Sequence, residues 1–187
     1  MNKKTLTTAT LSLFTALIAG CASQNLPPIA TVPQVELPRF MGKWYVIASI
    51  PSVIETDAYN AVESYTLEKD GSINTTFTFR DGSFDGKRKQ YKPHGFVVEN
   101  SGNALWGMQF IWPIKAEYRI AWLAPDYSRT VIARNARDYV WIMARAPSIT
   151  DAQYAELSEF VARLGYDMSK LRKVPQQWPS NSKAEGH

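Results

Sequence analysis

The sequence has little cysteine and little histidine, and both shortages exclude classes of site. Its 187 residues include one cysteine, Cys21, and two histidines, His94 and the terminal His187. A single cysteine allows no intramolecular disulfide and no cysteine-rich zinc site. Two histidines are too few for a histidine-based metal or catalytic cluster. We therefore expect neither a metal nor a cofactor.

Long apolar runs and concentrated positive charge are also missing. After the first twenty residues no apolar run approaches the about 20 residues that a bilayer span requires. The net charge is +4, and the one compact basic cluster is Lys87-Arg88-Lys89, which is typical of a solvated strand end. Nucleic-acid binding needs a concentrated basic face, so we expect no nucleic-acid partner.

The N-terminus, in contrast, carries a clear pattern. Met1–Lys4 is short and basic, and Thr5–Gly20 is uncharged and largely apolar. A basic start, an apolar stretch and then small residues are typical of a secretory signal peptide, which we assign to residues 1–20. Lys3 and Lys4 are the only charged residues in it, so its removal leaves a nearly neutral chain.

The end of that segment, Leu17-Ile18-Ala19-Gly20-Cys21, resembles the bacterial lipobox. The resemblance implies cleavage before Cys21 and transfer of a diacylglyceryl group to its thiol, which would anchor the protein in a membrane. Ala22 and Ser23 after the cysteine indicate transfer to the outer membrane. The alternative is an ordinary signal peptide with an incidental cysteine.

Four prolines lie within residues 21–38, which are almost uncharged. Because proline fixes φ and removes a hydrogen-bond donor, we expect this segment to be an extended, semi-rigid tether. It would lead to a folded domain over residues 39–175, followed by a tail over residues 176–187.

From Gly42 onward, short apolar segments alternate with turn residues, which is the pattern of successive antiparallel strands. The sequence Glu68-Lys69-Asp70-Gly71-Ser72 between two of them indicates a hairpin. Eight strands are predicted, over 43–50, 58–67, 73–79, 87–98, 104–112, 116–123, 130–134 and 139–145.

The period then changes to that of one late helix. Ser148 or Thr150 can cap it, Tyr154, Leu157, Val161 and Leu164 share a face, and Gly165 suits its end. Residues 171–174 could add a last short strand. We predict an all-β fold, an eight-stranded antiparallel up-and-down barrel with this helix packed outside; a sandwich is the alternative.

Strand alternation sorts the side chains into two faces. In the eighth strand Tyr139, Trp141 and Met143 share one face, and Val140, Ile142 and Ala144 share the other. The collected inner face is rich in aromatic residues. Such side chains either fill an eight-stranded barrel or line a cavity for an elongated apolar ligand, and composition does not distinguish the two.

Three short motifs then resemble the lipocalin family, and within it the bacterial outer-membrane lipoprotein group related to apolipoprotein D. Gly42-Lys43-Trp44 matches the Gly-x-Trp signature at the first strand. Asp126-Tyr127 lies in the expected turn, with Pro125 where the family carries Thr, and Arg145 ends the eighth strand. We expect Trp44 to plug one barrel end and Arg145 to lie over its indole, a structural role.

The resemblance implies a lipid-binding outer-membrane lipoprotein whose barrel faces the periplasm. It would hold fatty acids or lysophospholipids for storage or transport during envelope maintenance. By the family's alternation the cavity lining is Ala48, Glu63, Tyr65, Thr75, Phe77, Met108, Phe110, Tyr118, Ile120, Trp122, Ala133, Tyr139, Trp141 and Met143.

Glu63 is the one acidic member of this set. One interpretation makes it a rim residue in water or a partner of a nearby arginine. The other makes it a polar contact for a ligand head group, where its carboxylate would disfavour a fatty-acid anion and favour a choline or ethanolamine group.

The two alternatives to lipid binding are an enzyme and a structural adaptor. An enzyme is not expected, because Cys21 would be acylated, His94 has no partner evident in sequence, and no Gly-x-Ser-x-Gly elbow is present. A structural adaptor with a filled barrel is the stronger alternative. The outward apolar face of the last strand, with Trp106 and Trp112, leaves a homodimer open.

Overall fold

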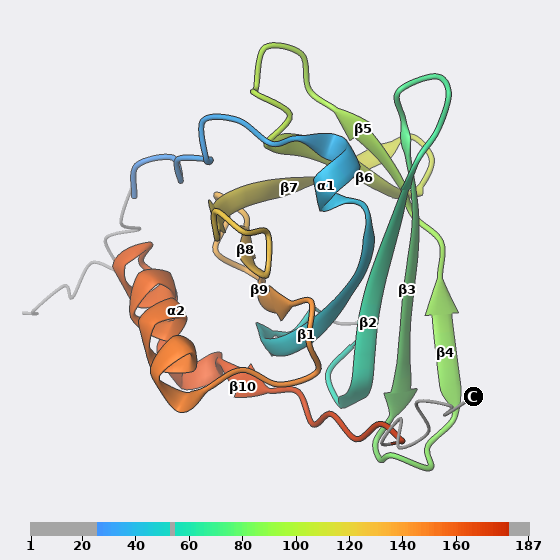
Figure 1. Cartoon of the computed structure of the whole chain (residues 1–187), viewed down its shortest axis with the longest axis vertical. Helices are drawn as coiled ribbons and strands as arrows, with labels where there is room; N and C mark the ends of the chain where they lie inside the picture. Colours follow the sequence, from blue (N-terminus) through green and yellow to red (C-terminus); the bar gives the residue numbers. More distant parts are fainter. Residues whose placement is uncertain (1–25, 53–54, 180–187) are drawn as a thin grey trace, which may run out of the picture.

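The computed structural model describes residues 26–52 and 55–179. One antiparallel sheet curls into a barrel, and a single long helix lies against its outside (Figure 1). The predicted signal peptide and Cys21 lie outside the described residues. No helix in the described ranges is long and apolar enough to cross a bilayer.

Ten strands form the sheet, in the order β10-β1-β2-β3-β5-β6-β7-β8-β9, and β4 pairs with β3. Pairing of β1 with β9, from Tyr45 opposite Ala144 to Ile50 opposite Val140, closes the barrel. The predicted barrel is therefore confirmed, and the sandwich is excluded. The strands are β1 Gly42–Ile50, β2 Ala58–Leu67, β3 Ile73–Asp81, β4 Arg88–Tyr91, β5 His94–Val97, β6 Leu105–Ile111, β7 Ile114–Leu123, β8 Arg129–Ala133, β9 Val140–Ala144 and β10 Arg172–Lys173.

The predicted strand over residues 87–98 is divided into β4 and β5. The break falls at Lys92-Pro93, and both parts pair with β3. Proline has no backbone N–H to donate, so a continuous ladder is interrupted there. The break has a consequence for the site, because it turns Lys92 and Pro93 toward the barrel opening.

The helix α2, Asp151–Arg163, begins as its sequence predicts. The Thr150 side chain accepts a hydrogen bond from the Gln153 N–H, and the Gln153 side chain bonds back to the Thr150 backbone. This capping box makes Thr150 the cap rather than Ser148. Gly165 ends the helix with φ +86°, a conformation that glycine adopts without strain. A 3₁₀ turn, η1 Met168–Lys170, leads into β10.

Two apolar clusters lie on opposite sides of the barrel wall. The interior cluster includes the large rings of Trp44, Tyr65 and Trp106. The outer cluster lies between the sheet and α2, where Leu157 and Val161 of the helix meet outward residues of β1, β8 and β9. The outward face of β9 is thus covered by the protein's own helix.

The described part of the predicted tether is packed on the barrel. The Val32 N–H donates to the Ile120 carbonyl at 2.9 Å, and the Val35 N–H donates to the Gly102 carbonyl at 2.8 Å. Ile29 and Val35 are buried. Residues 26–36 form neither helix nor strand, in keeping with the predicted extended tether, but they lie against the barrel, because packing there removes apolar side chains from water. A short helix, α1 Leu37–Phe40, follows.

The beginning of the predicted tail is also part of the fold. The Gln176 side-chain amide donates to the carbonyls of Val46 and Ala61 at 2.8 and 3.1 Å, across the gap where β1 and β2 separate. Asn60 exchanges hydrogen bonds with Gln177. Residues 176 and 177 therefore complete the sheet hydrogen bonding at the place where its two strands no longer pair.

Candidate functional site

One end of the barrel is hollow. Its cavity has a volume of about 390 Å³, within the range of small-molecule sites. Strand residues supply part of its wall, and the loops after β1, β4 and β8 supply the rest. The lining is Ser52, Glu55, Phe77, Tyr91, Lys92, Pro93, Phe110, Ile111, Ala116, Arg134, Tyr139 and Trp141.

The opposite end is filled by aromatic rings. Phe40 of α1 packs on Trp44 with their ring centroids 5.0 Å apart, and Trp106 stacks on Tyr118 with their ring centroids 4.9 Å apart. The Tyr65 and Tyr118 hydroxyls are 2.5 Å apart, so each buried polar tip has a partner. The sequence left open whether the barrel is filled with side chains or contains a cavity. One end of the barrel is filled, and the other end contains the cavity.

The residues predicted to line the cavity fall into three groups. Four of them border it: Phe77, Phe110, Tyr139 and Trp141. A second group is buried in the interior without bordering this cavity, and consists of Glu63, Tyr65, Thr75, Met108, Tyr118, Ile120 and Met143. These side chains have the predicted inward orientation but belong to the packed part of the barrel.

The third group, Ala48, Trp122 and Ala133, was wrongly placed. All three contribute to the outer cluster beneath α2. A register shift between Val46 and Ala48 inserts an extra residue into β1, and a second shift between Ile120 and Trp122 does so in β7. Such a bulge reverses the inward and outward alternation beyond it. In β8 the inward residue is Ile132.

The sequence prediction missed most of the polar lining. Ser52, Glu55, Lys92 and Arg134 come from loops or strand ends, where a period of two carries no information. The sequence indicated these residues only indirectly. Trp44 marks the closed end of the barrel, and these loops lie at the opposite end.

Glu55 is a nearly enclosed carboxyl group in the cavity wall. One of its oxygens accepts a hydrogen bond from the Trp141 indole N–H at 3.1 Å and one from the Ser52 N–H at 3.2 Å. Burial raises the pKa of Glu55 to about 7, against the lowering effect of these hydrogen bonds. The cavity therefore contains a carboxyl group whose ionisation falls near neutral pH, so that its protonated and ionised forms are both populated there.

Glu63 is buried deeper, with 1% of its surface exposed. Its Oε2 and the Thr75 hydroxyl have no hydrogen-bond partner among the described residues. Burial raises the pKa of Glu63 well above its usual value, and the nearby Glu55 raises it further. Glu63 is therefore neither a water-exposed rim residue nor, within the described part of the chain, an arginine partner; it lies in the packed interior, where burial favours the neutral form of its carboxyl group.

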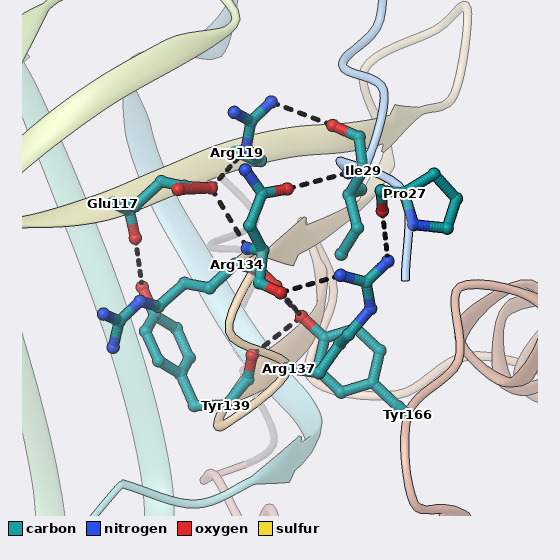
Figure 2. Close-up of polar contacts among 9 residues, drawn as sticks. Pro27, Ile29, Glu117, Arg119, Arg134, Arg137, Tyr139 and Tyr166 are labelled. Atoms are coloured by element: carbon teal, nitrogen blue, oxygen red, sulfur yellow. Dashed lines mark hydrogen bonds and ion pairs between the residues drawn. The ribbon is translucent and has the colours of Figure 1, made fainter. Parts of the chain in front are cut away.

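Two cationic side chains lie at the opening. Lys92 is exposed, and Arg134 is half-buried. Arg134 pairs with Asp138 at 2.8 Å. Its guanidinium carbon is 5.3 Å from the centre of the Tyr139 ring, and Figure 2 shows both of these side chains. The cavity thus combines an apolar aromatic interior with positive charge at its edge.

The plugged end has the predicted geometry. The Arg145 guanidinium carbon lies 3.8 Å from the centre of the Trp44 indole, and its nitrogens donate to the carbonyls of Arg39, Phe40 and Lys43. A Cβ on Gly42 would approach the guanidinium to 3.6 Å, and Gly42 has φ +88°. These residues hold the barrel end closed and do not touch the cavity.

The turn with Asp126-Tyr127 is hydrogen-bonded although Pro125 replaces threonine. One Asp126 oxygen accepts from the Ser128 N–H and hydroxyl at 3.0 and 2.7 Å. The Tyr127 hydroxyl accepts from the Glu36 N–H at 2.9 Å, which ties the turn to the segment before α1.

His94 has a partner that the sequence did not reveal. Its Nε2 lies 2.8 Å from the Ser72 hydroxyl, which in turn donates to Asp70 at 2.5 Å. With that proton directed to Asp70, the histidine acts as donor to the serine, and the arrangement lacks the base of a nucleophilic triad. Among the residues of the described ranges, no group of three potential ligands could hold a metal ion.

Comparison with known proteins agrees with this architecture. A family model described as a lipocalin-like domain matches residues 35–176, and the chain belongs to the lipocalin family. It is 30% identical over 154 residues to temperature-induced lipocalin-1 of Arabidopsis thaliana, covering 78% of this chain and 81% of that protein.

A bacterial relative and a solved structure extend the comparison. The chain is 26% identical to the outer membrane lipoprotein Blc of Escherichia coli K12, with 86% of this chain and 90% of that protein covered. The structure of insecticyanin from the tobacco hornworm superposes with a TM-score of 0.61 at 14% identity, over 82% of this chain and 86% of that one. This last similarity shows the fold alone.

Proposed function

We propose that the protein binds single-chain lipids, fatty acids or lysophospholipids, in the cavity at the open end of its barrel. The observation that carries the proposal is the combination of an apolar aromatic cavity with cationic groups at its edge. The acyl chain would lie among Phe77, Tyr139 and Trp141. Its carboxylate or phosphate would lie near Lys92 and Arg134.

The neutral form of Glu55 supports this orientation. A carboxylate ion in the cavity wall would repel an anionic head group, whereas the protonated acid can donate a hydrogen bond to it. Because ionisation of Glu55 falls near neutral pH, binding of an anionic lipid should weaken at alkaline pH.

We also infer a location from the sequence and the relatives. The lipobox resemblance at Cys21 and the similarity to an outer membrane lipoprotein support a protein anchored in the outer membrane, with its barrel in the periplasm. There it would store or transport lipids for envelope maintenance. Neither a catalytic role nor a filled-barrel adaptor is needed to account for the cavity.

Native mass spectrometry of the delipidated protein mixed with palmitate or a lysophospholipid tests the proposal. We expect saturable one-to-one binding of at least one of them. Ala116→Trp, which places an indole in the cavity wall, should abolish it. Ala162→Trp adds the same group on the exposed side of α2 and is the matched control. Absence of binding to the wild-type protein by any acyl lipid would refute the proposal.

A further inference from the structure

The turn that joins β6 to β7 carries an exposed apolar tip. Ile111, Trp112 and Ile114 are 72%, 82% and 70% exposed, and they flank Pro113. Contiguous large apolar side chains on a soluble surface usually mark a contact with a partner or a membrane. Phe110 and Ile111 also line the cavity, so the apolar tip is continuous with the mouth.

The N-terminal segment is fixed to the rim of the same barrel end. The Arg119 guanidinium donates to the Ile29 carbonyl at 2.8 Å, and the Ile29 N–H donates to the Asn135 side chain at 2.7 Å. Arg137 donates to the Pro27 carbonyl at 2.6 Å (Figure 2). Asn135 and Arg137 belong to the loop between β8 and β9, next to Arg134 at the cavity opening.

The chain length before this point allows Cys21 to reach the level of the tip. Along β7, Ile114 lies five residues before Arg119, a distance of about 17 Å for a strand. Leu26, the first described residue, lies five positions after Cys21, and a chain of that length spans up to about 17 Å. A lipid on Cys21 and the exposed tip can therefore reach one plane.

We propose that the Phe110–Ile114 tip docks on the lipid surface that holds the anchor, so that the cavity mouth faces the bilayer. The proposal rests on the proposed lipid anchor. Tryptophan is favoured at the boundary between head groups and acyl chains. A lipid ligand would then pass between bilayer and cavity without crossing water.

The charges around the tip fit an anionic phospholipid surface. Lys92 is exposed beside the mouth, and Lys115 follows the tip with its ammonium 3.7 Å from the centre of the Phe96 ring. The acidic groups nearby, Glu117 and Asp138, are paired with Arg119 and Arg134. Lys92 and Lys115 are both exposed, and neither forms an ion pair with an acidic side chain among the described residues.

The test uses the full-length protein purified with its lipid and reconstituted into vesicles of phosphatidylethanolamine and phosphatidylglycerol, 3:1, containing brominated acyl chains. Bromine quenches tryptophan fluorescence only at close range. We expect Trp112→Phe to remove at least half of the quenching seen in the wild-type protein. Trp178→Phe, which alters a half-exposed indole packed on Tyr45, should leave the quenching unchanged.

A second variant reports on function rather than position. Ile114→Glu should slow transfer of a fluorescent lysophospholipid from vesicles to the protein by at least fivefold, while its affinity for the same lipid in solution stays within twofold. Loss of solution affinity as well would indicate damage to the cavity and contradict the proposal.

The remaining outcomes separate the two hypotheses. Unquenched Trp112 in protein whose intact mass shows an acylated Cys21 overturns the docking proposal and leaves the anchor. Absence of lipid on Cys21 overturns the anchor and the docking with it. A dimer in detergent whose Trp112 stays unquenched assigns the tip to a second copy of the chain and also overturns the proposal.

Discussion

Trp141 donates its indole N–H to Glu55 across 3.1 Å, and this contact joins the aromatic interior of the barrel to the polar group in its cavity wall. Trp141 lies on β9, and Glu55 lies in the connection from β1 to β2. The pair therefore fixes a loop residue against the rigid wall of the site. The position of Glu55, and so the charge inside the cavity, depends on it.

The raised pKa of Glu55 predicts a stability that falls as pH rises. The unfolded chain releases this proton near pH 4.5, but the folded protein holds it up to about pH 7. Between these values the folded state binds more protons, so raising the pH favours unfolding; above about pH 7 the cost is constant. The loss amounts to about 3 kcal/mol.

Chemical denaturation between pH 4 and 8 measures this effect. Glu55→Gln should reduce the slope of the profile over that window, with the remaining slope due to Glu63, and Glu99→Gln, at an exposed position, should retain the wild-type profile. An unchanged slope in Glu55→Gln would show that the carboxyl is already ionised in the folded protein.

The cationic edge of the cavity predicts a head-group preference. Removing positive charge with Lys92→Gln or Arg134→Gln should weaken palmitate binding about three- to tenfold, the loss of one partly exposed charge-assisted contact. Lys69→Gln removes the same charge from the β2–β3 hairpin at the plugged end. If that control weakens binding equally, general electrostatic attraction rather than contact at the mouth holds the head group. Titration calorimetry provides the affinities.

Glu63 should matter for stability more than for ligand binding. Because Glu63 does not border the cavity, Glu63→Gln should change lipid affinity by less than threefold. A raised pKa lowers stability progressively as the pH rises above 4.5, so removing this ionisable group should make the protein more stable than the wild type at neutral pH. A tenfold loss of affinity for a choline-headed lipid would instead restore the head-group interpretation.

The contact between Trp44 and Arg145 predicts a structural phenotype. Trp44→Ala removes a buried indole from beneath the guanidinium and should cost about 3–5 kcal/mol of stability. Ligand selectivity should stay the same, because Trp44 does not line the cavity. Calorimetry that finds equal stability in mutant and wild type would contradict this role.

Sequence patterns correctly predicted the features that depend on residues close together in the chain. Strand alternation assigned β9 correctly, with Trp141 and Met143 inward and Val140 and Ile142 beneath the helix. The cap at Thr150 and the glycine at 165 were also readable, because capping involves residues a few positions apart. The motif residues Trp44 and Arg145 indicated which end of the barrel would be closed.

Other features depend on contacts between distant segments. The bulges that turn Ala48 and Trp122 outward follow from how β1 and β7 pair with their neighbours, and a single strand contains no record of that pairing. The packing of residues 26–38 on β7 likewise requires hydrogen-bond acceptors about ninety residues away, such as the Ile120 carbonyl.

The single cysteine and the apolar pattern thus determined the class of molecule: a barrel protein without disulfides, with an anchor expected at Cys21. The tertiary structure decided where the barrel is filled and where it is hollow. It also brought Glu55, Lys92 and Arg134 from three separate loops to one opening. The reason is physical: a cavity is the volume left after side chains from every strand have packed, and no local segment specifies that remainder.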